Sequence, residues 1–279
     1  MRKIFLLYLA CTITMLANAQ LLEIVSTQQL TIPSDETLKV AALSPQGDYL
    51  LLTNDVNRGL MYYHLSTRSI TTITDADGAG WGVKISPNGQ EIIYRERYMN
   101  ADQTLNNDIV KYTLNTQKRV LIAKGQRDLS KLVPTYQANT VSINGNLHMV
   151  LTRGGKMTIL TPNGTNEAYN WASISPDGTK ILYYVSGKGC YTCNLQGEDV
   201  TYIANHCRAP QWYNNHIIVG MHDEDNGKWL TASAIVAYSI QGQKQTLVNK
   251  EMMAIYPYTA DGKIAFSTVN GEIYLMNVK

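Results

Sequence analysis

Residues 174–184 read ISPDGTKILYY, and this stretch decides the fold because its first half recurs along the chain. Ser175-Pro176-Asp177-Gly178 has the composition of a tight turn: proline favours the first central position, aspartate tolerates the next, and glycine supplies a positive φ. The residues that follow, Ile181 to Tyr184, are β-branched, aliphatic and aromatic. The stretch therefore predicts a turn that leads directly into a strand.

Five other segments resemble this turn. They are Ser44-Pro45-Gln46-Gly47, Ser86-Pro87-Asn88-Gly89, Ser142-Ile143-Asn144-Gly145, Tyr213-Asn214-Asn215 and Thr259-Ala260-Asp261-Gly262. Their mean spacing is about 43 residues, with the widest interval between 86 and 142, and short β-rich runs flank each one. Four short strands repeated at such a period are typical of a β-propeller. The sequence therefore predicts an all-β fold, a six-bladed β-propeller with four-stranded antiparallel blades.

The two ends of the chain predict how the ring closes. The last unit has candidate strands at 254–258, 263–268 and 272–278 but no fourth, whereas two apolar runs near 22–25 and 30–32 precede the first unit. We expect this N-terminal strand to complete the last blade and cover an edge that would otherwise promote aggregation. Leu22, Ile24, Leu30 and Ile32 share one face by alternation. Burial of these four side chains would contribute roughly 6–12 kcal/mol.

The first nineteen residues predict a signal peptide. Arg2 and Lys3 precede a short apolar run, and Ala17-Asn18-Ala19 supplies small residues for cleavage after Ala19. We therefore expect residues 1–19 to be removed, residues 20–279 to form a single domain, and the protein to be periplasmic or secreted. The alternative is a lipoprotein processed at Cys11, but Tyr8 replaces the aliphatic residue usual in that motif.

Charge and hydropathy restrict the partners. The chain has 24 Lys and Arg and 22 Asp and Glu, and the two kinds become equal in number without Arg2 and Lys3. A balanced charge argues against nucleic-acid binding, which needs a basic stripe. We also expect no transmembrane segment in the mature chain, because no later run approaches the ~18 apolar residues of a membrane helix.

Two phrases resemble a known repeat. Ser175 to Tyr183 follows the pattern S-P-D-G-x-x-I-x-Y, and Gly271 to Asn277 follows G-x-I-Y-x-x-N. Both are similar to the repeats of TolB-like propellers, also called WD40-like or PD40 repeats. The resemblance covers about residues 40–279, strongly in three units. It implies a six-bladed ring and an envelope protein that binds other proteins, whereas an activity does not follow from such a scaffold alone.

Catalytic and metal motifs are not evident in the sequence. It has no Gly-x-Ser-x-Gly, no His-Glu-x-x-His and no phosphate loop. The acidic segments 75–78 and 223–227 resemble fragments of calcium loops but lack the full spacing and the terminal glutamate. The five histidines, on separate units or loops, are His64, His148, His206, His216 and His222. We therefore expect no cofactor, no metal and no enzymatic activity, although loops of a ring can bring distant histidines together.

Three cysteines allow three interpretations: a zinc or dithiol centre, one structural disulfide, or three free thiols. Cys190 and Cys193 form a Cys-x-x-Cys pair, and Cys207 follows His206, so that a zinc site or a dithiol centre is one hypothesis. Cys190 and Cys193 point to opposite faces of a predicted strand, however. A hairpin turn near 196–198 would bring residue 190 close to residue 205. We therefore favour a structural disulfide between Cys190 and Cys207, with Cys193 as a buried free thiol.

The aromatic residues indicate a binding surface. The chain has 18 tyrosines and two phenylalanines, and a tyrosine can pack its ring while its hydroxyl reaches water or a partner. Trp81, Trp171 and Trp212 belong to predicted inner strands near the central channel, where they either pack between blades or form an aromatic rim. Loops of the same face could add further ligand-binding residues: Arg58, Arg97, Tyr98, Arg153, Arg208 and Trp229.

Two functions fit these features. The first is an exported, non-catalytic propeller that binds an envelope protein or a peptide through its loop face. The alternative is a carbohydrate-binding propeller or a sugar-active lyase that uses the central channel.

Overall fold

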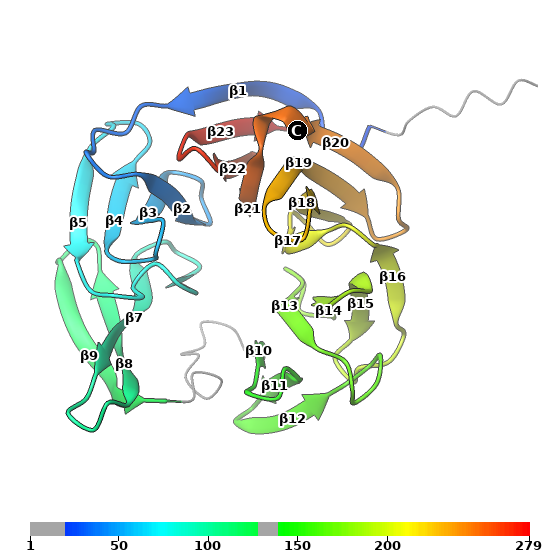
Figure 1. The fold of residues 1–279 in the computed structure, drawn as a ribbon, viewed down its shortest axis with the longest axis horizontal. Helices are drawn as coiled ribbons and strands as arrows, with labels where there is room; N and C mark the ends of the chain where they lie inside the picture. The colour runs from blue at the N-terminus through cyan, green and yellow to red at the C-terminus, as the bar shows by residue number, and fades with distance from the viewer. Residues whose placement is uncertain (1–19, 128–138) are drawn as a thin grey trace, which may run out of the picture.

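Six antiparallel sheets surround a central axis in the computed structural model, which describes residues 20–127 and 139–279 (Figure 1). The predicted signal peptide and Cys11 lie outside the described residues. Blades 1 to 3 contain the following strands in chain order: β2 (Leu38–Leu43), β3 (Tyr49–Asn54), β4 (Leu60–His64) and β5 (Ile70–Thr74); β6 (Lys84–Ile85), β7 (Glu91–Met99), β8 (Leu105–Thr113) and β9 (Lys118–Gln126); β10 (Asn139–Ile143), β11 (Met149–Arg153) and β12 (Lys156–Leu160).

Blades 4 to 6 complete the ring. Their strands are β13 (Tyr169–Ile174), β14 (Lys180–Val185), β15 (Gly189–Asn194) and β16 (Thr201–Ala204); β17 (Arg208–Trp212), β18 (Ile217–Asp225), β19 (Leu230–Ser239) and β20 (Lys244–Val248); β21 (Ala254–Ala260), β22 (Lys263–Thr268), β23 (Ile273–Val278) and β1 (Ile24–Leu30). A 3-10 helix, η2 (Lys250–Met252), connects blades 5 and 6. No helix within 20–127 and 139–279 has the length and apolar character that a membrane crossing requires.

The predicted six-bladed propeller is confirmed, with one difference in blade 3. Five sheets have four strands, whereas blade 3 has three strands in the described part of the chain. Only residues 161–168 connect β12 to β13, and they read TPNGTNEA, which is rich in turn formers. This connection is too short and too poor in β-branched residues to add an outer strand.

The ring closes as the sequence predicts, because β1 pairs with β23 in an antiparallel register from Ile24↔Val278 to Leu30↔Ile273. The expected burial of the closing strand is wrong in part. Leu22 is buried, but Ile24 is 39% exposed, and Leu30 and Ile32 are only partly buried. The register shifts between Ile24 and Ser26, so the bulge breaks the alternation on which the burial estimate relied.

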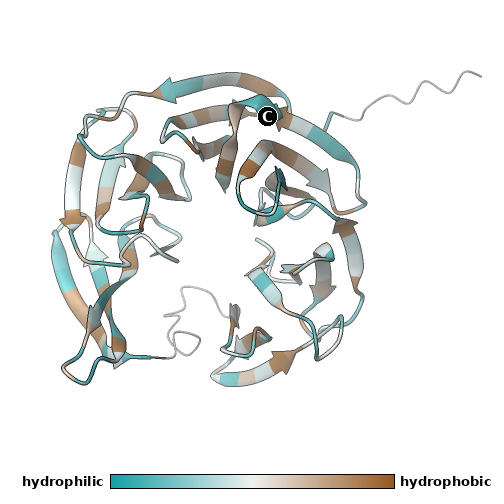
Figure 2. Cartoon of the chain, in the orientation of Figure 1, coloured by the Kyte–Doolittle hydropathy of each residue, from teal (hydrophilic) through white to brown (hydrophobic). Residues whose placement is uncertain are grey.

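The hydrophobic core lies between blades. Five clusters of buried side chains each join two adjacent blades; in one of them Leu50 and Leu52 of blade 1 pack with Ala265 and Leu275 of blade 6. Most hydrophobic positions in Figure 2 accordingly lie on strands rather than on connecting loops. Among the described residues these clusters join every pair of neighbouring blades except blades 2 and 3, and this packing holds the loops between the joined blades in defined positions.

A serine fastens the turn to the strand after it in blades 1, 2 and 4. The Ser175 hydroxyl donates to Asp177 Oδ1 at 2.6 Å and accepts from the Lys180 amide at 2.9 Å, and Ser44 and Ser86 make equivalent contacts. The turn in blade 3 is displaced by two residues from the predicted segment 142–145. Asn144 replaces the serine, and Leu147 occupies the positive-φ position that Gly178 holds in blade 4.

Candidate functional site

The topology gathers the predicted site residues at one end of the ring. Each blade begins with its inner strand, and its strands alternate in direction. The loops between second and third strands therefore emerge on the same side as the connections from one blade to the next. We call this side the connecting face; it includes residues 54–59, 75–83, 205–207, 226–229 and 249–253. Seven predicted residues lie on it or at the strand ends next to it: Arg58, Trp81, Tyr98, Arg153, Trp171, Arg208 and Trp229.

Trp212 lies elsewhere. It is the last residue of β17, only 8% exposed, and it packs in the cluster that contains Leu182 and Ile218. Its indole Nε1 donates to the Ser173 carbonyl at 3.4 Å. Trp212 therefore packs between blades 4 and 5, which is the first of the two roles the sequence allowed for the tryptophans.

A pocket of about 480 Å³ opens where blades 5 and 6 meet. We call it the blade 5–6 pocket, and its polar and aromatic lining consists of Arg208, Asp223, Asp225, Lys228, Trp229 and Tyr256. Trp229 is 66% exposed and Tyr256 is also exposed, so both rings are available to a ligand. Pockets with a few fixed polar groups among aromatic rings are the usual form of ligand sites.

Asp223 contributes an incompletely bonded carboxylate. Its side chain is only 3% exposed, and its Oδ2 accepts a charge-assisted hydrogen bond from Arg208 Nη1 at 2.5 Å. Its Oδ1 is buried and has no hydrogen-bond partner among the described residues. Because a buried carboxylate oxygen without a donor is costly, this atom is a site at which a ligand donor would be strongly favoured.

Arg208 links this carboxylate to an aromatic pair. Its guanidinium carbon lies 5.7 Å from the centre of the Trp171 ring, within the range of a cation–π contact. Trp171 in turn meets Tyr184 edge to face, with ring centres 5.4 Å apart and an interplanar angle of 72°. A continuous row of side chains thus runs from Tyr184 to Asp223, so Arg208 is held in place from two sides.

Backbone bulges interrupt the inner strands of blades 4, 5 and 6. The pairing of β13, β17 and β21 with their second strands shifts register at Trp171, Ala209 and Tyr256, and these residues have φ values of 48°, 47° and 50°. All three directly follow the residue at which the register begins to shift. Non-glycine residues in this left-handed region are strained, and such strain concentrates at functional sites. The bulges turn Trp171 and Tyr256 towards solvent.

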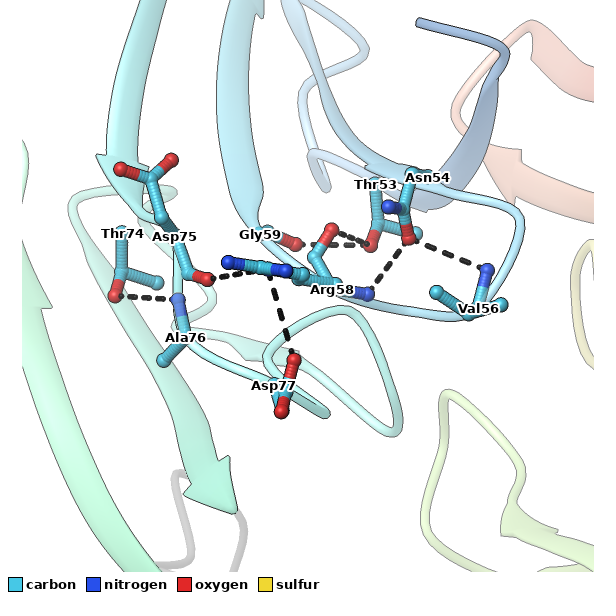
Figure 3. Close-up of polar contacts among 9 residues, drawn as sticks. All are labelled: Thr53, Asn54, Val56, Arg58, Gly59, Thr74, Asp75, Ala76 and Asp77. Atoms are coloured by element: carbon cyan, nitrogen blue, oxygen red, sulfur yellow. Dashed lines mark hydrogen bonds and ion pairs between the residues drawn. The ribbon is translucent and has the colours of Figure 1, made fainter. Parts of the chain in front are cut away.

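Arg58 organises loops on the far side of the ring (Figure 3). Its Nε donates to the Asp75 carbonyl at 3.3 Å and lies 3.7 Å from Asp77 Oδ1. Its backbone amide donates to Asn54 Oδ1 at 2.8 Å. Arg58 therefore fastens the second loop of blade 1 to the connection into blade 2, and its charge already has a counterion.

Tyr98 and Arg153 are further from a pocket. The Tyr98 hydroxyl donates to Asp108 Oδ1 at 3.2 Å, on the opposite side of β7 from Arg97. Arg153 is exposed at the end of β11. Sequence reasoning missed Asp223 and Tyr256, which line the blade 5–6 pocket. Their only sequence signals were an acidic segment that resembles a fragment of a calcium loop and the general excess of tyrosine.

The cysteines lie as alternation predicts. Cys190 and Cys193 belong to different core clusters, and the Cys190 thiol is in hydrogen-bond contact with Cys207. All three thiols are buried and reduced in the structure. Burial, followed by the contact with Cys207, raises the pKa of Cys190, and burial raises the pKa of Cys193 to about 12. The Cys190–Cys207 disulfide stays a prediction, with its two side chains already adjacent.

The histidines form a pair rather than a metal cage. The rings of His206 and His222 are stacked with centres 4.9 Å apart, and Lys244 Nζ lies 2.6 Å from His222 Nδ1. No group of three or more His, Cys, Asp or Glu side chains within 20–127 and 139–279 is placed to hold a metal ion.

Comparison with known proteins identifies the fold. No family model matches the chain, and no curated protein matches it. TolB from Acinetobacter baumannii shares 18% identity over 78% of this chain, with a TM-score of 0.56, and the chain spans 55% of that protein. A structure described as TolB from Agrobacterium tumefaciens shares 16% identity over 88% of this chain and 91% of its own length, with a TM-score of 0.59.

Oligogalacturonate lyase in complex with manganese shares 15% identity over 85% of this chain and 76% of its own, with a TM-score of 0.53. At these identities the likeness extends to the fold and not to an activity. The chain has the TolB-like six-bladed β-propeller fold that its repeated turn predicts.

Proposed function

We propose that the protein is an exported, non-catalytic propeller that binds an extended peptide segment of another envelope protein through its connecting face. The export rests on the predicted signal peptide at residues 1–19 and agrees with the likeness to TolB. The binding surface is the blade 5–6 pocket together with the row from Tyr184 to Asp223.

The free Oδ1 of Asp223 carries this proposal. A peptide presents backbone N–H groups and an N-terminal amine or lysine side chains, all of which are donors that this buried acceptor lacks. A donor bonded to Oδ1 would also complete the hydrogen bonding of the carboxylate that holds Arg208. The carboxylate would then fix the direction of the peptide, while the exposed rings supply contact area.

The aromatic residues support the same surface. Trp229 is exposed on the loop between β18 and β19, with Lys228 Nζ 5.5 Å from its ring centre, and Tyr256 projects from the β21 bulge across the pocket. Tryptophan, tyrosine and arginine are the residue types that contribute most to binding at protein interfaces. Aromatic side chains have only two side-chain torsions and therefore lose little conformational entropy on binding.

Carbohydrate binding is the second candidate. Exposed rings beside a buried carboxylate also suit a sugar, whose hydroxyl groups donate to carboxylates while its apolar face stacks on aromatic rings. The likeness in fold to oligogalacturonate lyase is consistent with this alternative without extending its activity to the present chain.

The two functions are separated by paired variants in affinity capture. Mature protein would be used as bait in an envelope extract from its native cells, with recovered proteins identified by mass spectrometry, and the same protein would be tested on a glycan array. Trp229→Ala removes an exposed ring with little effect on the core. Glu224→Gln, the neighbouring exposed carboxylate outside the pocket, serves as the matched control.

We expect a specific protein that wild type and Glu224→Gln recover equally and Trp229→Ala recovers at least tenfold less. Recovery of no specific protein by an abundant bait would contradict the proposal, as would equal recovery by Trp229→Ala. Loss of glycan binding in Trp229→Ala, without any protein partner, would establish the carbohydrate function instead.

A further inference from the structure

Blade 2 places two arginines side by side on the connecting face. Arg95 and Arg97 are two residues apart on β7, so alternation directs both side chains to the same side of the sheet. Arg95 is buried, and its guanidinium carbon lies 5.5 Å from the centre of the exposed Trp81 ring. A tryptophan ring at the surface therefore covers one of two adjacent cationic groups.

Neither arginine has a carboxylate partner. In the part of the chain that the structure describes, no Asp or Glu side chain lies within 4.0 Å of either guanidinium group. Arg95 Nε donates only to the Gly78 carbonyl, at 3.3 Å. Arg97 Nε is buried and has no hydrogen-bond partner among the described residues.

Three carboxylates on this blade and on the loop before it have other partners. Asp77 pairs with Arg58 at 3.7 Å (Figure 3), and Glu96, on the opposite side of β7, pairs with Arg119. Asp108 accepts from the Tyr98 hydroxyl at 3.2 Å and from the Gly125 amide at 2.8 Å. The other acidic groups of the blade therefore leave the charges of Arg95 and Arg97 uncompensated.

The two like charges of Arg95 and Arg97 repel each other in the absence of a counterion. Burial, followed by the like charge of Arg97, lowers the pKa of Arg95 to about 10. A buried guanidinium without a counterion is costly, and a second one beside it adds repulsion. An anion between the two groups would remove both costs.

The loop at residues 77–82 packs closely against its neighbours. Gly78 has a φ of +74°, and a Cβ there would lie 3.2 Å from Arg97 Cβ and 3.3 Å from its Nε. At Gly80 a Cβ would come within 2.2 Å of Thr53 Oγ1. The loop therefore packs closely against Arg97 at Gly78 and against Thr53 at Gly80, where glycine provides the space.

We propose that Trp81, Arg95 and Arg97 form a binding site for a carboxylate group. Two guanidinium groups present N–H donors that match the oxygens of a carboxylate, and the Trp81 ring shields Arg95 from water. The inference deepens the proposed function, on which it rests for the face involved, by naming a group that the ligand carries. That carboxylate belongs either to a peptide, as a C-terminus or acidic side chain, or to a sugar acid.

The site can be observed directly by NMR of the arginine side chains. Mature protein labelled with ¹⁵N-arginine would be titrated at constant ionic strength while the Nε–H signals of Arg95 and Arg97 are followed. The peptide probes are acetyl-trialanine with a free carboxylate and the same peptide with a C-terminal amide. Glucuronate and glucose are the corresponding sugar probes.

We expect the free carboxylates to shift both signals in a saturable manner and the amide and glucose to leave them unchanged. Whichever of the peptide and the sugar acid binds at least tenfold more tightly identifies the source. Arg97→Gln should weaken binding at least tenfold, whereas Arg119→Gln, which removes one charge from the other side of the same sheet, should stay within twofold of wild type.

Equal shifts by carboxylate and by chloride, or wild-type affinity in Arg97→Gln, would overturn the site. If Arg97→Gln does not fold, Trp81→Ala provides the same test, because that side chain is exposed and its loss leaves the core intact. Wild-type affinity in Trp81→Ala would then count equally against the proposal. Failure here is distinguishable from failure of the proposed function, since affinity capture depends on Trp229 and requires no response of the arginine signals.

Discussion

Exchange of one residue in the repeated turn should change stability in opposite directions in two blades. Gly178 in blade 4 and Leu147 in blade 3 hold the equivalent turn position, with φ values of 74° and 60°. Each donates its amide to the first turn residue, Ser175 or Asn144, at 2.8 and 3.0 Å. The backbone therefore makes the same demand at both positions, but only one of them has glycine.

The magnitude follows from the local surroundings. A Cβ added at Gly178 would have no atom within 4 Å, so Gly178→Ala introduces no clash and costs only the left-handed conformation. That cost is about 1–2 kcal/mol, offset by about 0.5–1 kcal/mol because alanine restricts the unfolded chain. We expect a net loss of about 1 kcal/mol, or a melting temperature lower by about 2–4 °C for a domain of this size.

Leu147→Gly should have the opposite effect. It relieves the same strain, and because Leu147 is 45% exposed it loses only part of a leucine's burial. We expect a gain of about 0.5–1 kcal/mol. The control is Gly145→Ala in the same turn, where φ is not positive and a Cβ would have no atom within 4 Å, so stability should not fall.

Thermal and urea unfolding followed by circular dichroism would measure all three variants, and the combined Gly178→Ala and Leu147→Gly variant should be additive within about 0.5 kcal/mol. A Leu147→Gly variant less stable than wild type by 1 kcal/mol, with Gly178→Ala neutral, would show that local backbone strain does not determine these turns.

Three further predictions concern the closure, a histidine and the thiols. Gln245→Ala should lower the free energy of unfolding in urea by about 1–3 kcal/mol. The reason is that Gln245 Oε1 accepts from the Leu21 and Leu22 amides at 2.7 and 2.8 Å, and its Nε2 donates to the Leu22 carbonyl at 2.8 Å. An unchanged midpoint would mean that this anchor is dispensable. Burial, then the Lys244 charge and the neighbouring histidine, lowers the pKa of His222 below 6.5, so folding disfavours its protonated form. Wild type should therefore lose stability as the pH falls through 6.5 towards the folded-state pKa, and His222→Gln should flatten this part of the pH–stability profile; identical profiles would contradict the sign of the shift. The thiols of Cys190, Cys193 and Cys207 are buried, so reduced native protein should resist alkylation until it is unfolded. Rapid labelling of the native protein would contradict this burial. Protein isolated from an oxidising compartment should show one disulfide by mass before reduction.

The site was less predictable than the fold, and particular residues show why. The sequence placed Trp81, Trp171 and Trp229 near one face, because strand order alone determines at which end a loop emerges. It could not separate Trp212 from them, because exposure depends on how the neighbouring blade packs. Asp223 became a candidate only when its free oxygen and its contact with Arg208 were visible. The sequence shows that Arg95 and Arg97 are two residues apart and share one side of a strand, but only the assembled blade shows that neither has a counterion.

The amino-acid sequence by itself determined the six-bladed ring and its closure by the N-terminal strand. Those features depend on short-range signals, namely turn chemistry and alternation within a strand, that are repeated in each blade. The tertiary structure alone decided the exposure of Ile24 at a bulge and the left-handed residues that turn Trp171 and Tyr256 outward. These features are register shifts between paired strands and local left-handed conformations, and neither follows from the alternation and turn chemistry that the sequence displays.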